Sequence, residues 1–151
     1  MQPLFDPDFD QARPVTPRLV LTYGTFDLFH YGHVRLLQRL SAMGTELIVG
    51  CSTDEFNNLK GKTSVMCFDQ RRAILESCRY VSRVISEETW EQKRTDIVNY
   101  NVSIFGMGDD WTGKFDHLND LTSVIYLPRT EDILTTQLRD QIGLSSRRAA
   151  G

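Results

Sequence analysis

The amino-acid sequence predicts an α/β domain built around a parallel β-sheet of five strands, and three observations lead to this fold class. Apolar runs of strand length alternate with longer runs of helix length from residue 18 onward. The strand-length runs are almost continuously apolar, which is typical of strands that helices cover on both faces. The chain has 151 residues, a length that suits one domain with its own hydrophobic core.

The first expected strand and helix follow each other directly. Residues 18–24, with the sequence RLVLTYG, form a short apolar run that ends in glycine and predicts a buried strand. The next run, GHVRLLQRLSAMG, places Val34, Leu37 and Leu40 on one face and predicts a helix that ends at Gly44.

The middle of the chain continues the alternation. The apolar run at residues 46–53 predicts the second strand, and residues 68–78, with Asp69 near the start, predict a helix. Residues 80–86 predict the third strand, and residues 90–101 a further helix.

Two more strands and a last helix complete the expected domain. The apolar runs at residues 103–108 and 123–128 predict the fourth and fifth strands, and residues 133–143 predict a helix that Gly143 ends. Four of the five prolines fall within the first 17 residues, so residues 1–17 are interpreted as an arm or linker. The domain is thus expected over residues 18–143, with residues 144–151 as a tail.

Composition narrows the classes of function. Apolar residues make up 40% and charged residues 25% of the chain, as in ordinary globular proteins. The net charge of −3 argues against a nucleic-acid-binding protein, which usually carries a basic face, although local basic clusters can still bind a small anion. No apolar run approaches the roughly 18 residues of a membrane span, so no membrane insertion is expected.

The cysteines predict neither a disulfide framework nor a zinc site. Their number is odd, and Cys51, Cys67 and Cys78 show no C-x-x-C or Cys/His spacing. Each lies in or beside an apolar run, so all three are expected to be buried thiols in a reducing compartment. The opening segment is acidic and proline-rich, unlike a signal peptide. These features together predict a cytoplasmic protein.

Polar residues collect just after four of the expected strands, where parallel sheets bind ligands. His30 and His33 are two of only three histidines and flank the expected helix start, with Gly32 between them. A helix N-terminus attracts anions, and two imidazoles beside it could donate hydrogen bonds to phosphate oxygens. Equally, one histidine could cap the helix while the other is a core residue. A two-histidine metal site is a further alternative, for which no third ligand has a telling spacing.

Cations and hydroxyls at the same edge favour a polyphosphate ligand. A serine in G-x-S-x-G and a cysteine beside a histidine are both lacking, so the sequence offers no convincing nucleophile. Phosphoryl or nucleotidyl transfer needs none, because its catalysis is mostly positioning and charge stabilisation. The cations and hydroxyls expected at this edge are Lys60, Lys62, Arg71, Arg72, Arg79, Arg129, Thr135 and Thr136.

The segments GTFDLFHYGH, STDEFN, RRAILESCRYV, MGDDWTGKFD and YLPRTEDILTT carry a resemblance that runs from about Leu19 to Ile142. GTFDLFHYGH contains the H-x-G-H signature of the nucleotidyltransferase superfamily. The chain resembles the cytidylyltransferases within it, and among these the branch of the teichoic-acid pathway that uses glycerol 3-phosphate. The resemblance implies a Rossmann-like, doubly wound parallel sheet of the nucleotidyltransferase type.

The resemblance also implies a reaction and a set of roles. CTP would react with the phosphate of glycerol 3-phosphate by direct in-line attack, giving CDP-glycerol and pyrophosphate, with Mg²⁺ accompanying CTP. The family is typically homodimeric, and the segment CRYV resembles one near its dimer interface. The implied catalytic residues are His30, His33, Lys60 and Arg129. The implied nucleotide-binding residues are Thr25, Phe26, Gly32, Asp110, Thr135 and Thr136. Lys62, Arg71, Arg79 and Trp90 are implied for the acceptor, and Asp27 for the metal.

Two positions depart from the family's second signature. Asp132 stands in place of a glycine and Leu134 in place of a serine that could cap a helix and bind phosphate. The acceptor could therefore be another polyol or sugar phosphate, and the nucleotide could be ATP. A non-catalytic nucleotide-binding protein is the alternative from a different class.

Overall fold

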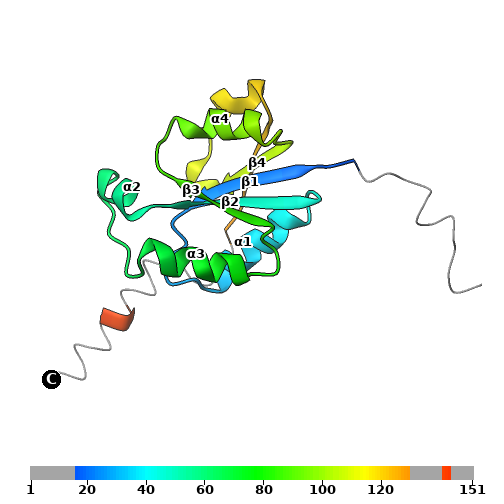
Figure 1. The fold of residues 1–151 in the computed structure, drawn as a ribbon. Coiled ribbons are helices and arrows are strands. Elements are labelled where there is room, and N and C mark those ends of the chain that lie inside the picture. The colour runs from blue at the N-terminus through cyan, green and yellow to red at the C-terminus, as the bar shows by residue number, and fades with distance from the viewer. Residues whose placement is uncertain (1–15, 130–140, 144–151) are drawn as a thin grey trace, which may run out of the picture.

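The computed structural model describes residues 16–129 and 141–143, and these form a parallel sheet with helices on both faces (Figure 1). The strands are β1 (Leu19–Gly24), β2 (Glu46–Ser52), β3 (Arg83–Glu87), β4 (Ile104–Gly108) and β5 (Ser123–Leu127). The helices are α1 (Tyr31–Ser41), α2 (Asp54–Leu59), α3 (Phe68–Ser77) and α4 (Gln92–Asn99). Two short 3₁₀ helices, η1 (Asp109–Trp111) and η2 (Asp116–Asp120), lie between β4 and β5.

The sheet has the order β3-β2-β1-β4-β5, and every neighbouring pair is parallel. The chain builds outward from β1 to β3 and then crosses back to β4 and β5 on the other side of β1. The order therefore reverses between β1 and β4, which makes this the switch point of a doubly wound sheet. The predicted α/β fold with five parallel strands is confirmed.

The hydrophobic core consists of two layers, one on each face of the sheet. Helices α1 and α3 cover one face, whereas α4 and the 3₁₀ helices cover the other (Figure 1). Val20 and Leu21 are neighbours in β1 and belong to different layers, as the alternation of a strand requires. Leu37 and Leu40 of α1 are completely buried, and each contributes roughly 1.5–3 kcal/mol by this burial.

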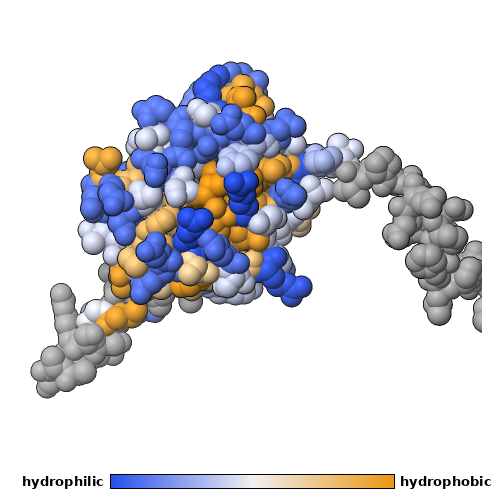
Figure 2. Space-filling view, viewed as in Figure 1, coloured by the Kyte–Doolittle hydropathy of each residue, from blue (hydrophilic) through white to orange (hydrophobic). Residues whose placement is uncertain are grey.

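The space-filling view shows the surface over the open edge of the sheet. Apolar side chains gather in the middle of this face, over the strands, and hydrophilic side chains surround them (Figure 2). Strand β3 lies at this edge and pairs with β2 alone within the described sheet.

The end of the first helix differs from the prediction. Helix α1 ends at Ser41, and Gly44 lies in the connection to β2. A Cβ on Gly44 would lie 2.2 Å from the carbonyl oxygen of Arg18, to which the next backbone N–H, that of Thr45, donates a 2.8 Å hydrogen bond. Gly44 is thus required by the close approach of the chain ahead of β1, not by the termination of the helix.

Helix α2 was not predicted from the sequence, where its residues were interpreted as part of the segment after the second strand. Thr53 caps the helix, since its Oγ1 accepts a 3.1 Å hydrogen bond from the N–H of Phe56. Asp54 and Glu55 in the first turn complement the partial positive charge of the helix N-terminus.

Smaller differences concern the third strand, the cysteines and the termini. Strand β3 begins at Arg83, three residues after the predicted start. Of the cysteines, Cys51 is buried, Cys78 is partly buried and Cys67 is exposed, so the expectation of three buried thiols is wrong. Among the described residues, no helix has the length and apolar character needed to cross a membrane. The predicted arm lies mostly outside the described residues, as do the tail and most of the last helix, of which 141–143 are helical.

Candidate active site

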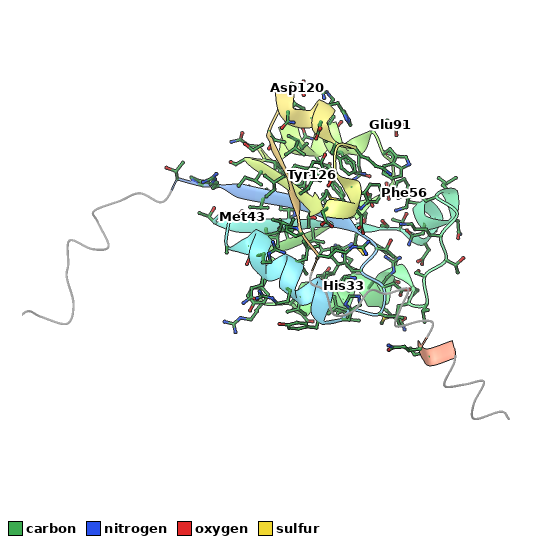
Figure 3. All side chains as sticks on the ribbon, turned by 180° about the vertical axis from the view of Figure 1, so that it is seen from behind. His33, Met43, Phe56, Glu91, Asp120 and Tyr126 are labelled. Carbon is green, nitrogen blue, oxygen red and sulfur yellow. The ribbon has the colours of Figure 1, made fainter. Side chains whose placement is uncertain are left out.

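A cavity of about 650 Å³, called the main cavity below, opens at the switch point between β1 and β4. Figure 3 shows Phe56 of α2 and Glu91, just before α4, on one side of the fold, and Met43 on the opposite side. Phe56 and Glu91 mark the carboxyl ends of the strands, where the sequence predicted the site. The predicted site residues that line the main cavity are Thr25, Phe26, Asp27, His30, Gly32, His33, Lys60, Lys62, Trp90, Asp110 and Arg129.

A second cavity of about 700 Å³, called the side cavity, adjoins the first. Its own lining includes Lys114, Arg94 and His117, and it is rich in aromatic surface. A ligand in one cavity would therefore meet a ligand in the other across a common wall. The residues of this shared wall are Lys60, Lys62, Trp90, Lys93, Trp111 and Phe115.

The turn after β1 holds a strained backbone under the histidines. Phe26 has a φ of 53°, in the left-handed region, where a bulky residue costs roughly 1–3 kcal/mol. Its ring lies so close to Gly24 that a Cβ there would be 2.8 Å from the Phe26 ring. The same ring packs edge-on against His33, with ring centroids 5.4 Å apart. The packing of the Phe26 ring against Gly24 and His33 thus stabilises the strained turn and supports the His33 ring.

The two histidines cap α1 and support each other. Nδ1 of His30 accepts a 3.0 Å hydrogen bond from the N–H of Gly32, and Nδ1 of His33 accepts a 3.2 Å bond from the N–H of His30. Because Nδ1 is an acceptor in both rings, the hydrogen-bond pattern places the proton of each neutral ring on Nε2. The capping and the phosphate-binding hypotheses are therefore compatible: one nitrogen caps, and the other is a donor.

Both imidazoles are neutral at pH 7. Burial lowers the pKa of His33 to about 3, with a further lowering from nearby His30 and an opposing effect from Asp27. Burial also lowers the pKa of His30. The pair consequently offers hydrogen-bond donors to an anion without adding a formal charge.

Asp27 holds the segment after Lys62 in place. Its two carboxylate oxygens accept hydrogen bonds of 2.7 Å from the N–H of Val65 and 2.9 Å from the N–H of Met66. The residue is only 3% exposed. These contacts are suited to a loop anchor. A carboxylate hydrogen-bonded in this way can also contact a metal ion, since it has about four lone-pair sites.

Arg71 does not line either cavity, which corrects its predicted contact with the acceptor. It is completely buried. Its guanidinium donates to the carbonyl oxygens of Thr25, Ser52 and Met66 at 2.7–3.0 Å and to the carboxylate of Asp54 at 2.8 Å. Arg71 thus ties the ends of β1 and β2 to the loop ahead of α3, and acts on the site through their backbone.

Arg79 also lies away from both cavities. It is exposed, follows the end of α3, and its guanidinium carbon lies 5.7 Å from the centroid of the Tyr80 ring. Since α3 starts at the site edge and runs back along the sheet, its end lies near the amino ends of the strands. The predicted acceptor contact of Arg79 is not supported within this chain.

Lys60 is part of the shared wall, and polar and aromatic contacts hold its ammonium group there. Its ammonium donates a 3.1 Å hydrogen bond to Oγ of Ser52 and lies 3.9 Å from a carboxylate oxygen of Glu87. It also lies 4.4 Å from the centroid of the Phe56 ring, a cation–π contact. Burial lowers the pKa of Lys60, and Glu87 opposes this effect.

Lys62 and Trp90 face both cavities, as expected of residues near the acceptor. The Trp90 ring packs against those of Phe56 and Trp111, at centroid distances of 5.4 Å and 6.0 Å. The ammonium of Lys62 lies 5.9 Å from the Trp111 ring. An aromatic wall that carries ammonium groups is thus available to a small anionic ligand.

Arg129 and Asp110 form an ion pair at the rim of the main cavity. The hydrogen bond to Asp110 raises the pKa of Arg129. Thr25 lies deeper, and its hydroxyl donates a 3.1 Å hydrogen bond to the side chain of Asn57. Thr135 and Thr136 lie outside the described residues, as do the two departures from the family pattern, Asp132 and Leu134.

Sequence reasoning missed Glu87, which lines the main cavity, and three residues of the shared wall. Glu87 ends β3, and Lys93 lies in α4 with its ammonium 2.5 Å from the Glu87 carboxylate. Glu87 could have been found, because it follows the third strand just as the predicted residues follow the others. The sequence does not indicate a site role for Lys93, because it lies in a helix with several charged residues that are usually exposed. For Trp111 and Phe115 the sequence gives only their place in the segment MGDDWTGKFD.

The arrangement suits the transfer of a phosphorus group between two anions. Neutral imidazole donors face one cavity, and the ammonium groups of Lys93, which is buried, and Lys60, which is partly buried, lie between the cavities. Positioning and charge stabilisation of this kind are sufficient for phosphoryl and nucleotidyl transfer, which need no protein nucleophile.

Comparisons with known proteins agree with this geometry. Residues 21–148 match the family model described as cytidylyltransferase-like. The chain is 53% identical over 123 residues to a glycerol-3-phosphate cytidylyltransferase of Bacillus subtilis (strain 168), which covers 82% of this chain and 95% of that protein. It is 52% identical to the Staphylococcus aureus protein of the same name, over 82% of this chain and 93% of that one.

Among solved structures, the lipopolysaccharide core biosynthesis protein from Thermoplasma volcanium is similar, with a TM-score of 0.65 and 20% identity. The match covers 77% of this chain and 100% of that one. At this level of identity the likeness concerns the fold alone.

Proposed function

The chain belongs to the cytidylyltransferase-like family, and on that basis we propose that it transfers CMP from CTP to the phosphate of glycerol 3-phosphate. The products are CDP-glycerol and pyrophosphate. The observation that carries this function is the pair of adjoining cavities with Lys60 between them and the histidine pair in one. The identity of 53% over nearly the whole length of a glycerol-3-phosphate cytidylyltransferase supports the choice of acceptor.

The reaction requires one bond to form and one to break at the α-phosphorus of CTP. A phosphate oxygen of the acceptor attacks the α-phosphorus in line, and the bond from this phosphorus to the bridging oxygen of the β-phosphate breaks. The electron pair leaves with pyrophosphate. The acceptor phosphate is largely dianionic at pH 7, since its second pKa is about 6, so the attack needs no general base.

The main cavity is the proposed CTP site. Nε2–H of His30 and of His33 would donate to phosphate oxygens, where negative charge grows as pyrophosphate departs. Arg129 would bind the triphosphate at the rim, and Thr25 and Phe26 would meet the nucleotide at the turn after β1. The proposed roles of Gly32 and Asp110 in the same cavity rest on their lining positions.

The side cavity is the proposed acceptor site. Its cations suit the acceptor phosphate, and Trp90 gives an apolar surface for the glycerol carbons. Lys60 and Lys62 lie on the shared wall, where they would neutralise the repulsion between the acceptor and CTP. Lys93, which the sequence did not single out, lies on the same wall.

Magnesium is proposed to accompany CTP, and Asp27, which lines the main cavity, stays the proposed contact to it. Its two backbone hydrogen bonds are compatible with this role, because an ionised carboxylate has about four lone-pair sites. Among the described residues, no group of three His, Cys, Asp or Glu side chains could hold a metal. Mg²⁺ commonly binds through substrate phosphates and water with few protein ligands. The steps proposed above use only residues of this chain.

A homodimer in the cytoplasm, serving teichoic-acid synthesis, completes the proposal. The open edge of the sheet at β3 supports the dimer, since an unpaired edge strand with apolar surface favours association. The residues CRYV lead into this strand.

A pyrophosphate-release screen tests the proposed function. The chain would be incubated with CTP or ATP against a panel of phosphorylated alcohols that includes glycerol 3-phosphate and longer polyol phosphates. Turnover that is fastest with CTP and glycerol 3-phosphate is expected. Faster turnover with another acceptor or with ATP would reassign the substrate, and CTP binding without turnover on any acceptor would contradict catalysis.

A further inference from the structure

Glu87 is a buried carboxylate to which the proposed reaction assigns no role. It is the last residue of β3, it stands opposite Ser52 of β2, and it is 3% exposed. Removing a carboxylate from water costs several kcal/mol unless nearby charges and hydrogen bonds compensate. The partners of Glu87 therefore indicate why a charge is placed at this position.

Those partners are the ammonium groups of Lys60 and Lys93, two of the three lysines of the shared wall. One carboxylate oxygen of Glu87 accepts a 2.5 Å hydrogen bond from Nζ of Lys93. The other accepts a 2.5 Å bond from Oγ of Ser52, which in turn accepts from Nζ of Lys60 at 3.1 Å. A single carboxylate thus anchors Lys93 directly and Lys60 through one hydroxyl.

Both ammonium groups also contact aromatic rings. Nζ of Lys93 lies 4.6 Å from the ring centroids of both Tyr23 and Trp90. Ring faces attract a cation, but a carboxylate gives the strong, directed contact. The direction in which the two ammonium groups point therefore depends on Glu87.

We propose that Glu87 is a positioning residue, which holds Lys60 and Lys93 at the boundary of the two cavities so that they face the reacting phosphates. This inference rests on the proposed cytidylyltransferase function. One carboxylate against two lysines leaves the cluster with a net charge of +1. The cluster can therefore be buried without ligands and still attract two anionic substrates.

Charge balance around Lys60 gives the proposal a measurable signature. The charged groups that face Lys60 are Glu87 from β3, Lys93 from α4, Arg71 from α3 and Lys62 from its own loop. Burial lowers the pKa of Lys60, the three cations lower it further, and Glu87 raises it. Removing the Glu87 charge should make Lys60 lose its proton at a lower pH.

The test is Glu87→Gln, which keeps the shape but removes the charge, with Glu88→Gln as the matched control at the next, exposed residue. We expect kcat to fall about tenfold and the alkaline limb of the kcat/KM profile to move to lower pH. Glu88→Gln should match the parent in both. A Glu87→Gln protein with the parent's kcat and pH profile would overturn the proposal.

A second variant keeps the proposal testable if Glu87→Gln does not fold. Ser52→Ala leaves both charges and removes only the hydroxyl link between Glu87 and Lys60. A smaller loss of kcat with the same direction of pH shift is expected, and unchanged kinetics in Ser52→Ala would contradict the proposed link. Absence of turnover in the parent protein would instead contradict the proposed function.

Discussion

The backbone N–H of His30 donates to Nδ1 of His33, and the two rings stack with centroids 3.9 Å apart. The start of α1 and the phosphate side of the main cavity are consequently built from the same two side chains. Their effects on stability and on activity can nevertheless be separated. Nδ1 of each ring accepts a bond at the helix start, whereas Nε2 is the proposed donor to phosphate.

His30→Asn should separate the cap from the chemistry. Asparagine is among the best N-cap residues and can replace Nδ1 as the acceptor for Gly32, but it has no group at the position of Nε2. Turnover should fall by about 10²–10³-fold, as for the loss of one donor to a developing charge. His30→Ala should lose the same activity and also about 1 kcal/mol of stability. Equal melting temperatures for the two variants would contradict a capping role.

His33 predicts a pH dependence of stability. Its pKa is about 3 in the folded chain, compared with about 6.5 when unfolded, so the unfolded state binds more protons between these values. The free energy of unfolding should fall as the pH is lowered from about 6.5 towards 3, by at most about 1.4 kcal/mol per pH unit from this group. Above about pH 6.5 His33 is neutral in both states, so its titration does not change the free energy of unfolding.

Thermal unfolding of the parent and of His33→Asn at pH 7.5, 6 and 5 would measure this contribution. Asparagine can keep an acceptor for the N–H of His30 but does not titrate. The melting temperature of the variant should decline less steeply with acid, and parallel curves would count against a buried neutral His33.

Asp27→Asn should loosen the loop, and it also tests the predicted metal contact of Asp27. An amide can accept from only one of the N–H groups of Val65 and Met66, and the mismatch should cost about 1–3 kcal/mol. Hydrogen exchange at these two amides should become faster. A rise in the Mg²⁺ concentration for half-maximal turnover is expected if Asp27 contacts the metal, and an unchanged concentration would contradict that contact.

Lys114→Gln and Arg39→Gln form a matched pair of variants that tests which cavity binds which substrate. Lys114 lines only the side cavity and Arg39 only the main cavity. Loss of one such cation, exposed at Lys114 and partly exposed at Arg39, should raise a KM about threefold to tenfold. Lys114→Gln should raise the KM for glycerol 3-phosphate, whereas Arg39→Gln should raise that for CTP. The reverse pattern in initial-rate kinetics would exchange the two assignments.

Sedimentation equilibrium tests the proposed dimer. A mass of about twice the 17.3 kDa of one chain is expected at micromolar concentration. Arg79→Glu reverses an exposed charge just ahead of β3 and should raise the dissociation constant without lowering the stability of the monomer. A parent protein that sediments with the mass of one chain would rule out the dimer.

The sequence was sufficient to predict the sheet and the edge that carries the site. Continuous apolar runs gave β1 and β2 within a residue or two, and the rule that parallel sheets bind at carboxyl ends brought His30, Lys60 and Arg129 together. These features depend on local patterns and on one general rule of topology.

The roles of Arg71 and Glu87 could not be predicted in the same way. An arginine in the first turns of a helix is usually exposed, whereas Arg71 is buried because carbonyls of Thr25, Ser52 and Met66 converge on it. Glu87 is tolerated because Lys93 from the next helix reaches it. Each depends on segments that only the folded chain brings together.

The anchoring of the loop between α2 and α3 has a consequence for engineering. Asp27 accepts hydrogen bonds from the backbone N–H groups of Val65 and Met66, and Arg71 donates one to the carbonyl oxygen of Met66. These anchors therefore use main-chain atoms of the loop. The side chains of Thr63 and Ser64 line the main cavity, and they can be randomised while the main-chain anchors persist. A library at these two positions would search for new nucleotide selectivity on a fixed scaffold.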